Sequence, residues 1–183
     1  MPEQDQWESY YDPPAILTKL ELTNTSHNVV EFGCGYGTFS IAAAQIVSGA
    51  VFALDIDSSI LRGANIRSES LGLTNIEFIE RDFVGPGTGL ADGIADYAML
   101  FNILHTEDPV GLLCEAWRNV KPPGKVGVIH WNFDVGTPRG PPMEIRPRPV
   151  DCERWAKAAG LDCGPVIDLP PYHYGYILSS VTS

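Results

Sequence analysis

The chain has 183 residues, of which 44% are hydrophobic, and its 23 acidic side chains against 12 basic ones give a net charge of −11. This length and composition are typical of one soluble domain, and the lack of any run of about 18 apolar residues predicts no membrane span. The acidic balance disfavours a nucleic-acid enzyme, because such enzymes normally present basic side chains to phosphates.

The amino-terminal region is aromatic at residues 7–14 and precedes the first predicted strand. Residues 1–6 are acidic and lack the apolar core of a secretory signal, so we expect a cytoplasmic protein. The four cysteines, Cys34, Cys114, Cys152 and Cys163, form no C-x-x-C pair and no zinc spacing. We therefore expect no metal site and reduced thiols, with a pairing of Cys152 and Cys163 left open.

A short apolar run ends at Glu31 and enters a turn that carries Gly33, Gly35 and Gly37, after which residues 41–47 are Ala-rich and suited to a helix. This order predicts a strand, a glycine loop and a helix start whose free N–H groups lie close to a ligand. The Glu31 carboxylate would repel a pyrophosphate and attract an ammonium or sulfonium. The turn therefore predicts a site for a zwitterionic or cationic ligand.

Two further acids follow predicted strands. Asp55 ends an apolar run about 20 residues beyond the glycine loop, the spacing at which an acid can accept hydrogen bonds from ribose hydroxyls. Asp57 is expected to cap a helix over residues 58–71. The next strand leads to Asp82 and Phe83, which suit the amine and the ring of an adenine.

The strand over residues 95–101 leads to the polar residues Asn102 and His105, and a helix is expected to begin near Thr106. A fifth, buried strand is predicted over residues 125–131. The carboxyl ends of these strands are where open α/β sheets bind their ligands.

The carboxyl-terminal part begins with a loop over residues 132–149 that is dense in Gly and Pro, followed by a helix over 150–159. Two strands over 166–169 and 174–178 are joined by a connection too short for a parallel return, so they pair antiparallel. We predict an α/β fold: a Rossmann-like three-layer sandwich whose mostly parallel, seven-stranded sheet ends in an antiparallel hairpin. We expect a single domain over 1–183, with an amino-terminal lid or helical segment over 1–27 and a core over 28–183.

The E-x-G-x-G-x-G motif that begins at Glu31 is followed by Asp55, Asp82 and Asn102 after the next three predicted strands. In this order and approximate spacing, the chain resembles the class I S-adenosylmethionine-dependent methyltransferases, specifically their small single-domain members. The resemblance runs from about Val29 to the carboxyl end. It implies S-adenosylmethionine as cofactor and in-line transfer of its methyl group. The cofactor-binding residues that it implies are Tyr11, Glu31, Gly33, Cys34, Gly35, Gly37, Asp55, Ile56, Asp82, Phe83, Asn102 and Ile103.

The acceptor is expected to be a small molecule, with no nucleic-acid or membrane partner, and the protein a monomer or homodimer. His105 and His130 are candidate catalytic bases, with His173 a weaker third, although His130 could equally hydrogen-bond backbone at its strand end. The candidate substrate-binding residues are His105, Trp131 and Arg146. In related methyltransferases an aromatic amino-terminal segment can fold over the cofactor as a lid; here it could equally be a helix on the sheet edge.

Two other functions remain open at this point. An NAD-type oxidoreductase needs G-x-G-x-x-G, but Thr38 stands where the third glycine should fall. The terminal antiparallel hairpin also disfavours it. The other is a domain that binds S-adenosylmethionine without catalysing transfer.

Overall fold

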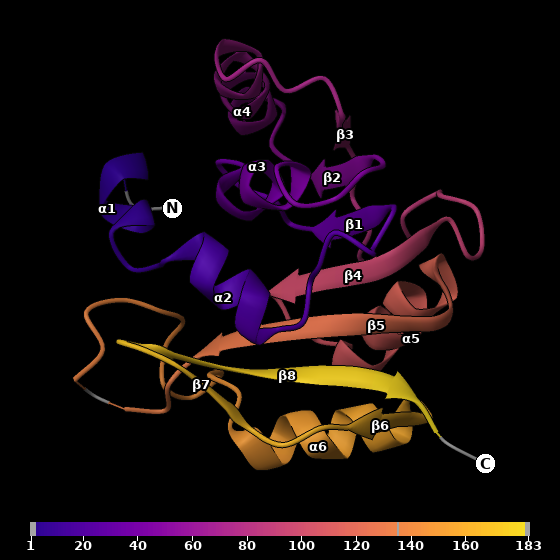
Figure 1. The fold of residues 1–183 in the computed structure, drawn as a ribbon. Coiled ribbons are helices and arrows are strands. Elements are labelled where there is room, and N and C mark those ends of the chain that lie inside the picture. Colours follow the sequence, from indigo (N-terminus) through magenta and orange to yellow (C-terminus); the bar gives the residue numbers. More distant parts are fainter. Residues whose placement is uncertain (1–2, 135, 182–183) are drawn as a thin grey trace.

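The computed structural model of the protein describes residues 3–134 and 136–181. Within these residues, eight strands form one sheet in the order β3-β2-β1-β4-β5-β8-β6, with β7 paired to β8 (Figure 1). The strands are β1 (Val29–Phe32), β2 (Val51–Asp55), β3 (Ile76–Glu80), β4 (Ala95–Phe101), β5 (Val120–Trp131), β6 (Leu161–Cys163), β7 (Ile167–Leu169) and β8 (His173–Ser180).

The first five strands are parallel to one another, and β8 is antiparallel to β5, β6 and β7. The mostly parallel sheet with an antiparallel end is therefore confirmed. The sheet has eight strands where the pattern predicted seven, because β6 and β7 pair with two separate stretches of β8. The three-residue β6 was too short to give a pattern of its own.

The helices are α1 (Gln4–Glu8), α2 (Pro13–Lys19), α3 (Thr38–Ala44), α4 (Ser58–Ser70), α5 (Pro109–Asn119) and α6 (Pro149–Ala158). Asp57 caps α4, as expected, by accepting from the backbone of Ser59 at 2.9 Å. Asp108 caps α5 in the same way through Gly111 N, at 2.8 Å. The helix therefore begins at Pro109, a few residues later than expected, because the capping side chain is Asp108.

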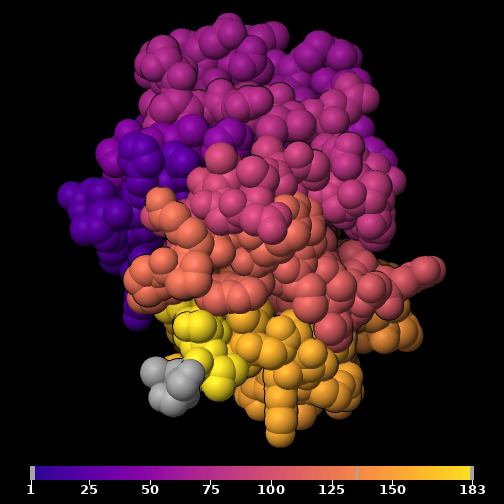
Figure 2. Space-filling model, turned by 90° about the vertical axis from the view of Figure 1, so that its right-hand side faces the viewer, coloured from indigo at the N-terminus to yellow at the C-terminus, as the bar shows by residue number. Residues whose placement is uncertain are grey.

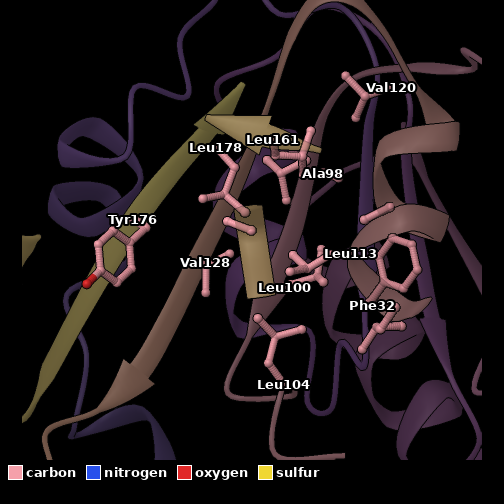
Figure 3. Close-up of a cluster of buried hydrophobic side chains, with 14 of the residues drawn as sticks. Phe32, Ala98, Leu100, Leu104, Leu113, Val120, Val128, Leu161, Tyr176 and Leu178 are labelled. Carbon is pink, nitrogen blue, oxygen red and sulfur yellow. The ribbon is translucent and has the colours of Figure 1, made fainter. Parts of the chain in front are cut away.

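The sheet is covered on both faces. One face packs against α5 and α6 around a core that includes Phe32, Leu100, Leu113 and Val128 (Figure 3). The other packs against α2 and α3, with α4 over β2 and β3. Alternation along β4 supplies both cores, since Ala98 and Leu100 face α5 while Met99 and Phe101 face α2 and α3.

The order of the strands separates the two halves of the chain. In the space-filling view, the purple and magenta part with β1 to β3 lies above the orange and yellow second half, and the indigo amino-terminal segment lies at the left beside both (Figure 2). The carboxyl ends of β1, β4 and β5 all point toward the side on which α1 and the loop after β5 lie (Figure 1). The four cysteines carry no disulfide, and no described helix is long and apolar enough to cross a membrane.

Candidate functional site

The glycine turn between β1 and α3 adopts a conformation that side chains disfavour. Gly33, Gly35 and Gly37 have φ angles of +74°, +53° and +73°. A Cβ at Gly37 would lie 3.0 Å from the Cβ of Ala64 on α4, and one at Gly33 would lie 2.7 Å from the side chain of Ile103. The glycines therefore hold a loop that packs tightly between α4 and the end of β4.

Glu31 is buried beside this loop, with 2% of its surface exposed. The Ser40 hydroxyl, on α3, donates a hydrogen bond to its carboxylate. Burial raises the pKa of Glu31 to about 8, and the negative charge of Asp55 adds to the shift while the Ser40 bond opposes it. Burial likewise raises the pKa of the neighbouring Cys34 thiol. A cation bound at this loop would stabilise the Glu31 carboxylate.

Asp55 joins the end of β2 to the glycine loop. One carboxylate oxygen accepts from Gly35 N at 2.9 Å, and the other accepts from Asp57 N at 3.0 Å. The side chain is half-buried, and the next residue, Ile56, is 66% exposed. Asp55 therefore stands at the loop, as the spacing predicted, and supports its backbone directly.

Asp82 and Phe83 follow β3. Asp82 is exposed and accepts from Val84 N at 3.1 Å. Phe83 is buried, with its ring edge-on to Phe32 at 5.4 Å, and its tip lies 3.8 Å from where a Cβ would stand at Gly33. The Phe83 ring therefore forms a wall shared by the core and the glycine loop.

Asn102 follows β4 with a left-handed backbone, φ +57°, an uncommon conformation for a residue other than glycine. Its Nδ2 donates to the Tyr11 hydroxyl at 3.0 Å. Its Oδ1 is buried and, among the described residues, has no hydrogen-bond partner. A buried amide oxygen without a partner indicates that a ligand donates a hydrogen bond to it.

The amino-terminal segment lies over the site and is tied to it at two places. Glu8 on α1 forms an ion pair with Arg67 on α4 and accepts from the Thr38 hydroxyl at the start of α3. Tyr11 bonds to Asn102, and its ring packs edge-on against Phe39 at 5.2 Å. The segment therefore spans the glycine loop from α4 to β4.

Three histidines approach one another at the ends of β4, β5 and the start of β8. His130 and His173 are buried, with pKa values lowered to about 3, and burial is the main cause for both. For His130 the nearby His105 and His173 add to the shift, and for His173 the charge of Arg146 does. Burial also lowers the pKa of the half-buried His105. His130 Nε2, His105 Nδ1 and both ring nitrogens of His173 have no partner among the described residues.

His173, ranked last from the sequence, lies in an aromatic cluster. Its ring stacks on Tyr11 at 4.4 Å and lies 4.2 Å from that of Trp131, its partner across β5 and β8. Trp7, Tyr10 and Tyr172 also contact Trp131. The strand register that brings His173 beside Trp131 is not visible in the local pattern.

Arg146 is buried and organises the loop after β5. Each guanidinium nitrogen donates to oxygens of this loop; the acceptors are the carbonyl oxygens of Asn132, Asp134, Arg139 and Pro141 and the hydroxyl of Thr137. The guanidinium donors of Arg146 are thus used within the protein, where they hold the loop after β5. Gly140, at φ +117°, packs against both Arg146 and Trp131.

Ser40, Glu8 and Arg67 contact the candidate site but were not predicted from the sequence. Ser40 lies nine residues after Glu31, in the first turn of α3, and a polar residue at that position was a detectable signal. The Glu8–Arg67 pair had none, because 59 residues separate its members. Across residues 3–134 and 136–181, no group of three or more His, Cys, Asp or Glu side chains is arranged to hold a metal ion.

The chain is similar to known methyltransferases. A family described as a methyltransferase domain matches residues 23–140. A curated relative from Methylococcus capsulatus, named ribosomal protein L11 methyltransferase, is 36% identical over 144 residues; the match covers 73% of this chain and 45% of the relative. The chain thus spans less than half the length of that protein.

Solved structures share the fold. That of an S-adenosylmethionine-dependent methyltransferase from Aquifex aeolicus has a TM-score of 0.85 at 24% identity, covering 98% of this chain and 94% of the other. A type 11 methyltransferase structure from Sulfolobus solfataricus has a TM-score of 0.75 at 22% identity, covering 95% of each chain. At these identities the likeness establishes the arrangement of the sheet and helices.

Proposed function

Since the chain belongs to the methyltransferase-domain family and has the fold of the S-adenosylmethionine-dependent enzymes, we propose that it transfers a methyl group from S-adenosylmethionine to a small-molecule acceptor. The observation that carries the proposal is the glycine loop, whose backbone is left-handed at Gly33, Gly35 and Gly37, with the buried Glu31 beside it. The family membership argues against the NAD-type oxidoreductase.

The residues at the loop fit this cofactor. Asn102 Oδ1 is a buried acceptor without a partner among the described residues, so it suits an ammonium or another N–H group. Asp55 is half-buried at the loop, where its carboxylate would accept from ribose hydroxyls, and Glu31 would offset the positive charge of the ligand. The remaining residues proposed to bind it are Tyr11, Gly33, Cys34, Gly35, Gly37, Ile56, Asp82, Phe83 and Ile103.

The cofactor supplies an activated methyl group on a sulfonium, so the protein needs to align the acceptor and exclude water. We assign water exclusion to the amino-terminal segment, which Glu8 and Tyr11 hold across the loop. His105 is the proposed proton acceptor, because it is half-buried with Nδ1 unpartnered, and its lowered pKa keeps it neutral near pH 7. We place the fully buried His130 behind His105, as a neutral side chain that positions it.

A small acceptor is supported by the charge of the chain. Its net charge of −11 disfavours contact with nucleic acid or an anionic membrane. The M. capsulatus relative is named for a ribosomal protein, so a protein acceptor is the alternative to test. We further propose a monomer or homodimer in a reducing cytoplasm, where the four free cysteines stay reduced.

Two measurements test the proposal. In calorimetric titration, S-adenosylmethionine and S-adenosylhomocysteine should bind while NADH does not; the reverse result would exclude the assignment. Then S-adenosylmethionine with a labelled methyl group is incubated with the protein and a cell extract divided by size. Label in the small-molecule fraction supports the proposal. Label in protein would refute the small acceptor, and binding without transfer to either fraction would indicate a non-catalytic domain.

A further inference from the structure

A cavity of about 390 Å³ lies beyond the carboxyl ends of β4 and β5. Its walls come from residues 104–107 after β4, residues 144–147 of the loop after β5, and the helix α6. Residues 104–107 directly follow Asn102 and Ile103, which we propose to contact the cofactor. The cavity is therefore next to the proposed cofactor site along the chain, and large enough for a small organic molecule.

Two polar atoms in its wall lack partners. His105 Nδ1 and Thr106 Oγ1 are buried and have no hydrogen bond to any described residue, although both residues line the cavity. Leaving such atoms unsatisfied is costly in a folded protein, so their presence together points to a polar ligand. Either atom could bond to a donor group, since a hydroxyl oxygen and a neutral imidazole nitrogen both accept.

The charges around the cavity favour a cation. Three carboxylates line it against one guanidinium. Glu107 and Glu144 are exposed and come from two different segments of the wall. Asp151 accepts from Arg148 N and pairs with Arg154, whereas every guanidinium nitrogen of Arg146 is bonded to the loop. An anionic ligand would therefore meet carboxylates at the rim and find the donors of Arg146 already used.

The rest of the wall is apolar. The buried Leu104 lines the cavity, and the half-buried Trp155 lines it from α6. An indole ring attracts both hydrocarbon and an ammonium group above its face. The lining thus combines an apolar wall, two unpartnered acceptors and an acidic rim.

We propose that this cavity binds the methyl acceptor and that the acceptor carries an alkylammonium group. The inference rests on the proposed function and names its substrate class. The bound ammonium gives one proton to the His105 imidazole. The nitrogen lone pair then forms a bond to the methyl carbon of the sulfonium while the C–S bond breaks, and its electron pair stays with the sulfur. The products are a methylated ammonium and S-adenosylhomocysteine, and His105 returns its proton to water.

Binding is measured on protein saturated with S-adenosylhomocysteine, so that no turnover occurs. Three probes of the same shape are titrated: benzylamine, benzyl alcohol and benzoate. We expect benzylamine to bind roughly tenfold more tightly than either of the others, with a preference that weakens as salt rises. Equal binding of the three, or tightest binding of benzoate, would overturn the inference.

A charge-matched pair of variants locates the effect. Glu107→Gln with Glu144→Gln should remove the preference for benzylamine. Glu69→Gln with Glu77→Gln makes the same change in net charge at exposed positions on α4 and β3 and should retain it. Loss of the preference in both double variants would show that only overall charge matters, and the cavity assignment would fail.

The two proposals fail in different ways. If S-adenosylhomocysteine does not bind, the proposed function is wrong; if it binds normally and the amine preference is missing, only the substrate class is wrong. A last titration identifies the source of the ammonium. It compares N-acetyl-lysine methylamide with benzylamine, and the norleucine counterpart of the lysine compound is the control without an ammonium. Selective binding of the lysine compound over benzylamine assigns the cavity to a lysine side chain, and the opposite order assigns it to a free amine.

Discussion

Asn102 Nδ2 donates a hydrogen bond to the Tyr11 hydroxyl oxygen at 3.0 Å, across 91 residues of sequence. The bond joins the end of β4 to the segment between α1 and α2, and Tyr11 in turn stacks on His173 at the start of β8. This bond holds the side-chain amide of Asn102, whose backbone is left-handed at φ +57°. The amino-terminal segment therefore contacts both the end of β4 and the start of β8.

Tyr11→Phe removes this bond and leaves the ring contacts in place. The Asn102 amide loses a partner, which costs about 0.5–1.5 kcal/mol, so the Kd for S-adenosylmethionine should rise by roughly 2- to 10-fold. Calorimetric titration measures the change. Tyr10→Phe, which removes the hydroxyl of the adjacent tyrosine, is the control and should leave the Kd unaltered. Equal Kd values for all three proteins would mean that the Tyr11 hydroxyl has no part in cofactor binding.

Gly35→Val should abolish binding of S-adenosylmethionine while the circular dichroism spectrum persists. Valine is strongly disfavoured at the φ of +53° that Gly35 adopts, so the loop must move away from its ligand-binding shape. Gly63→Ala on α4 is the matched control, because a Cβ there meets no atom within 4 Å. It should stabilise the helix by about 0.5–1 kcal/mol and bind the cofactor normally. Normal affinity in Gly35→Val would refute the loop assignment.

Asp55→Ala should weaken cofactor binding by about 1–3 kcal/mol, since it removes the acceptor for ribose hydroxyls and for Gly35 N together. Asp57→Ala, two residues on, removes only the cap of α4. It should cost about 0.5–2 kcal/mol in the free energy of unfolding and leave the Kd unchanged. The two variants therefore separate binding from stability, and an unchanged Kd in Asp55→Ala would place the ribose elsewhere.

Glu31→Gln should change how stability depends on pH. Burial raises the pKa of Glu31 from 4.5 to about 8, so the folded protein keeps a proton that the unfolded chain releases, and stability is lost as pH rises through this window. Relative to the variant, the wild type should lose up to ~1.4 kcal/mol per pH unit between about pH 4.5 and 8. Urea unfolding at pH 5, 6.5 and 8 gives the two slopes. Parallel slopes would show that Glu31 does not titrate there.

His130→Leu should make the protein more resistant to acid. Burial lowers the pKa of His130 from 6.5 to about 3, so the unfolded chain takes up a proton that the folded protein excludes, and stability is lost as pH falls from 6.5 toward 3. Leucine fills similar space and removes both the titration and the unpartnered Nε2. The gain in unfolding free energy over wild type should grow between pH 8 and pH 5. A gain that stays constant between pH 8 and pH 5 would contradict the lowered pKa of His130.

Much of the site was predictable because its signals are local. The glycine turn after Glu31, the spacing to Asp55 and the polar Asn102 after an apolar strand each follow from a few adjacent residues, and parallel strands bring their carboxyl ends to one edge. The antiparallel end of the sheet followed from a connection too short for a crossover. Strand pairing could not be predicted in the same way, because it depends on residues far apart in the chain. No hydrophobic pattern showed that β6 and β7 both pair with β8.

The role of Arg146 could not be predicted from its residue type alone. Arg146 was predicted from the sequence to contact the substrate, but its guanidinium donates to carbonyl oxygens of its own loop. Backbone carbonyl oxygens need donors once the loop folds, a requirement that residue types alone do not show. His173 is similar, because its place between Tyr11 and Trp131 depends on strand pairing and on the amino-terminal segment.

The sequence alone determined the class of fold, the strand-to-helix turn and the acids beside it, because periodicity and backbone freedom act over a few residues. Tertiary structure alone decided which distant side chains meet. The Glu8–Arg67 ion pair, the Tyr11–Asn102 bond and the grouping of three histidines join residues far apart in the chain. These contacts are set by the packing of whole helices and strands, which brings together side chains that no short stretch of sequence relates.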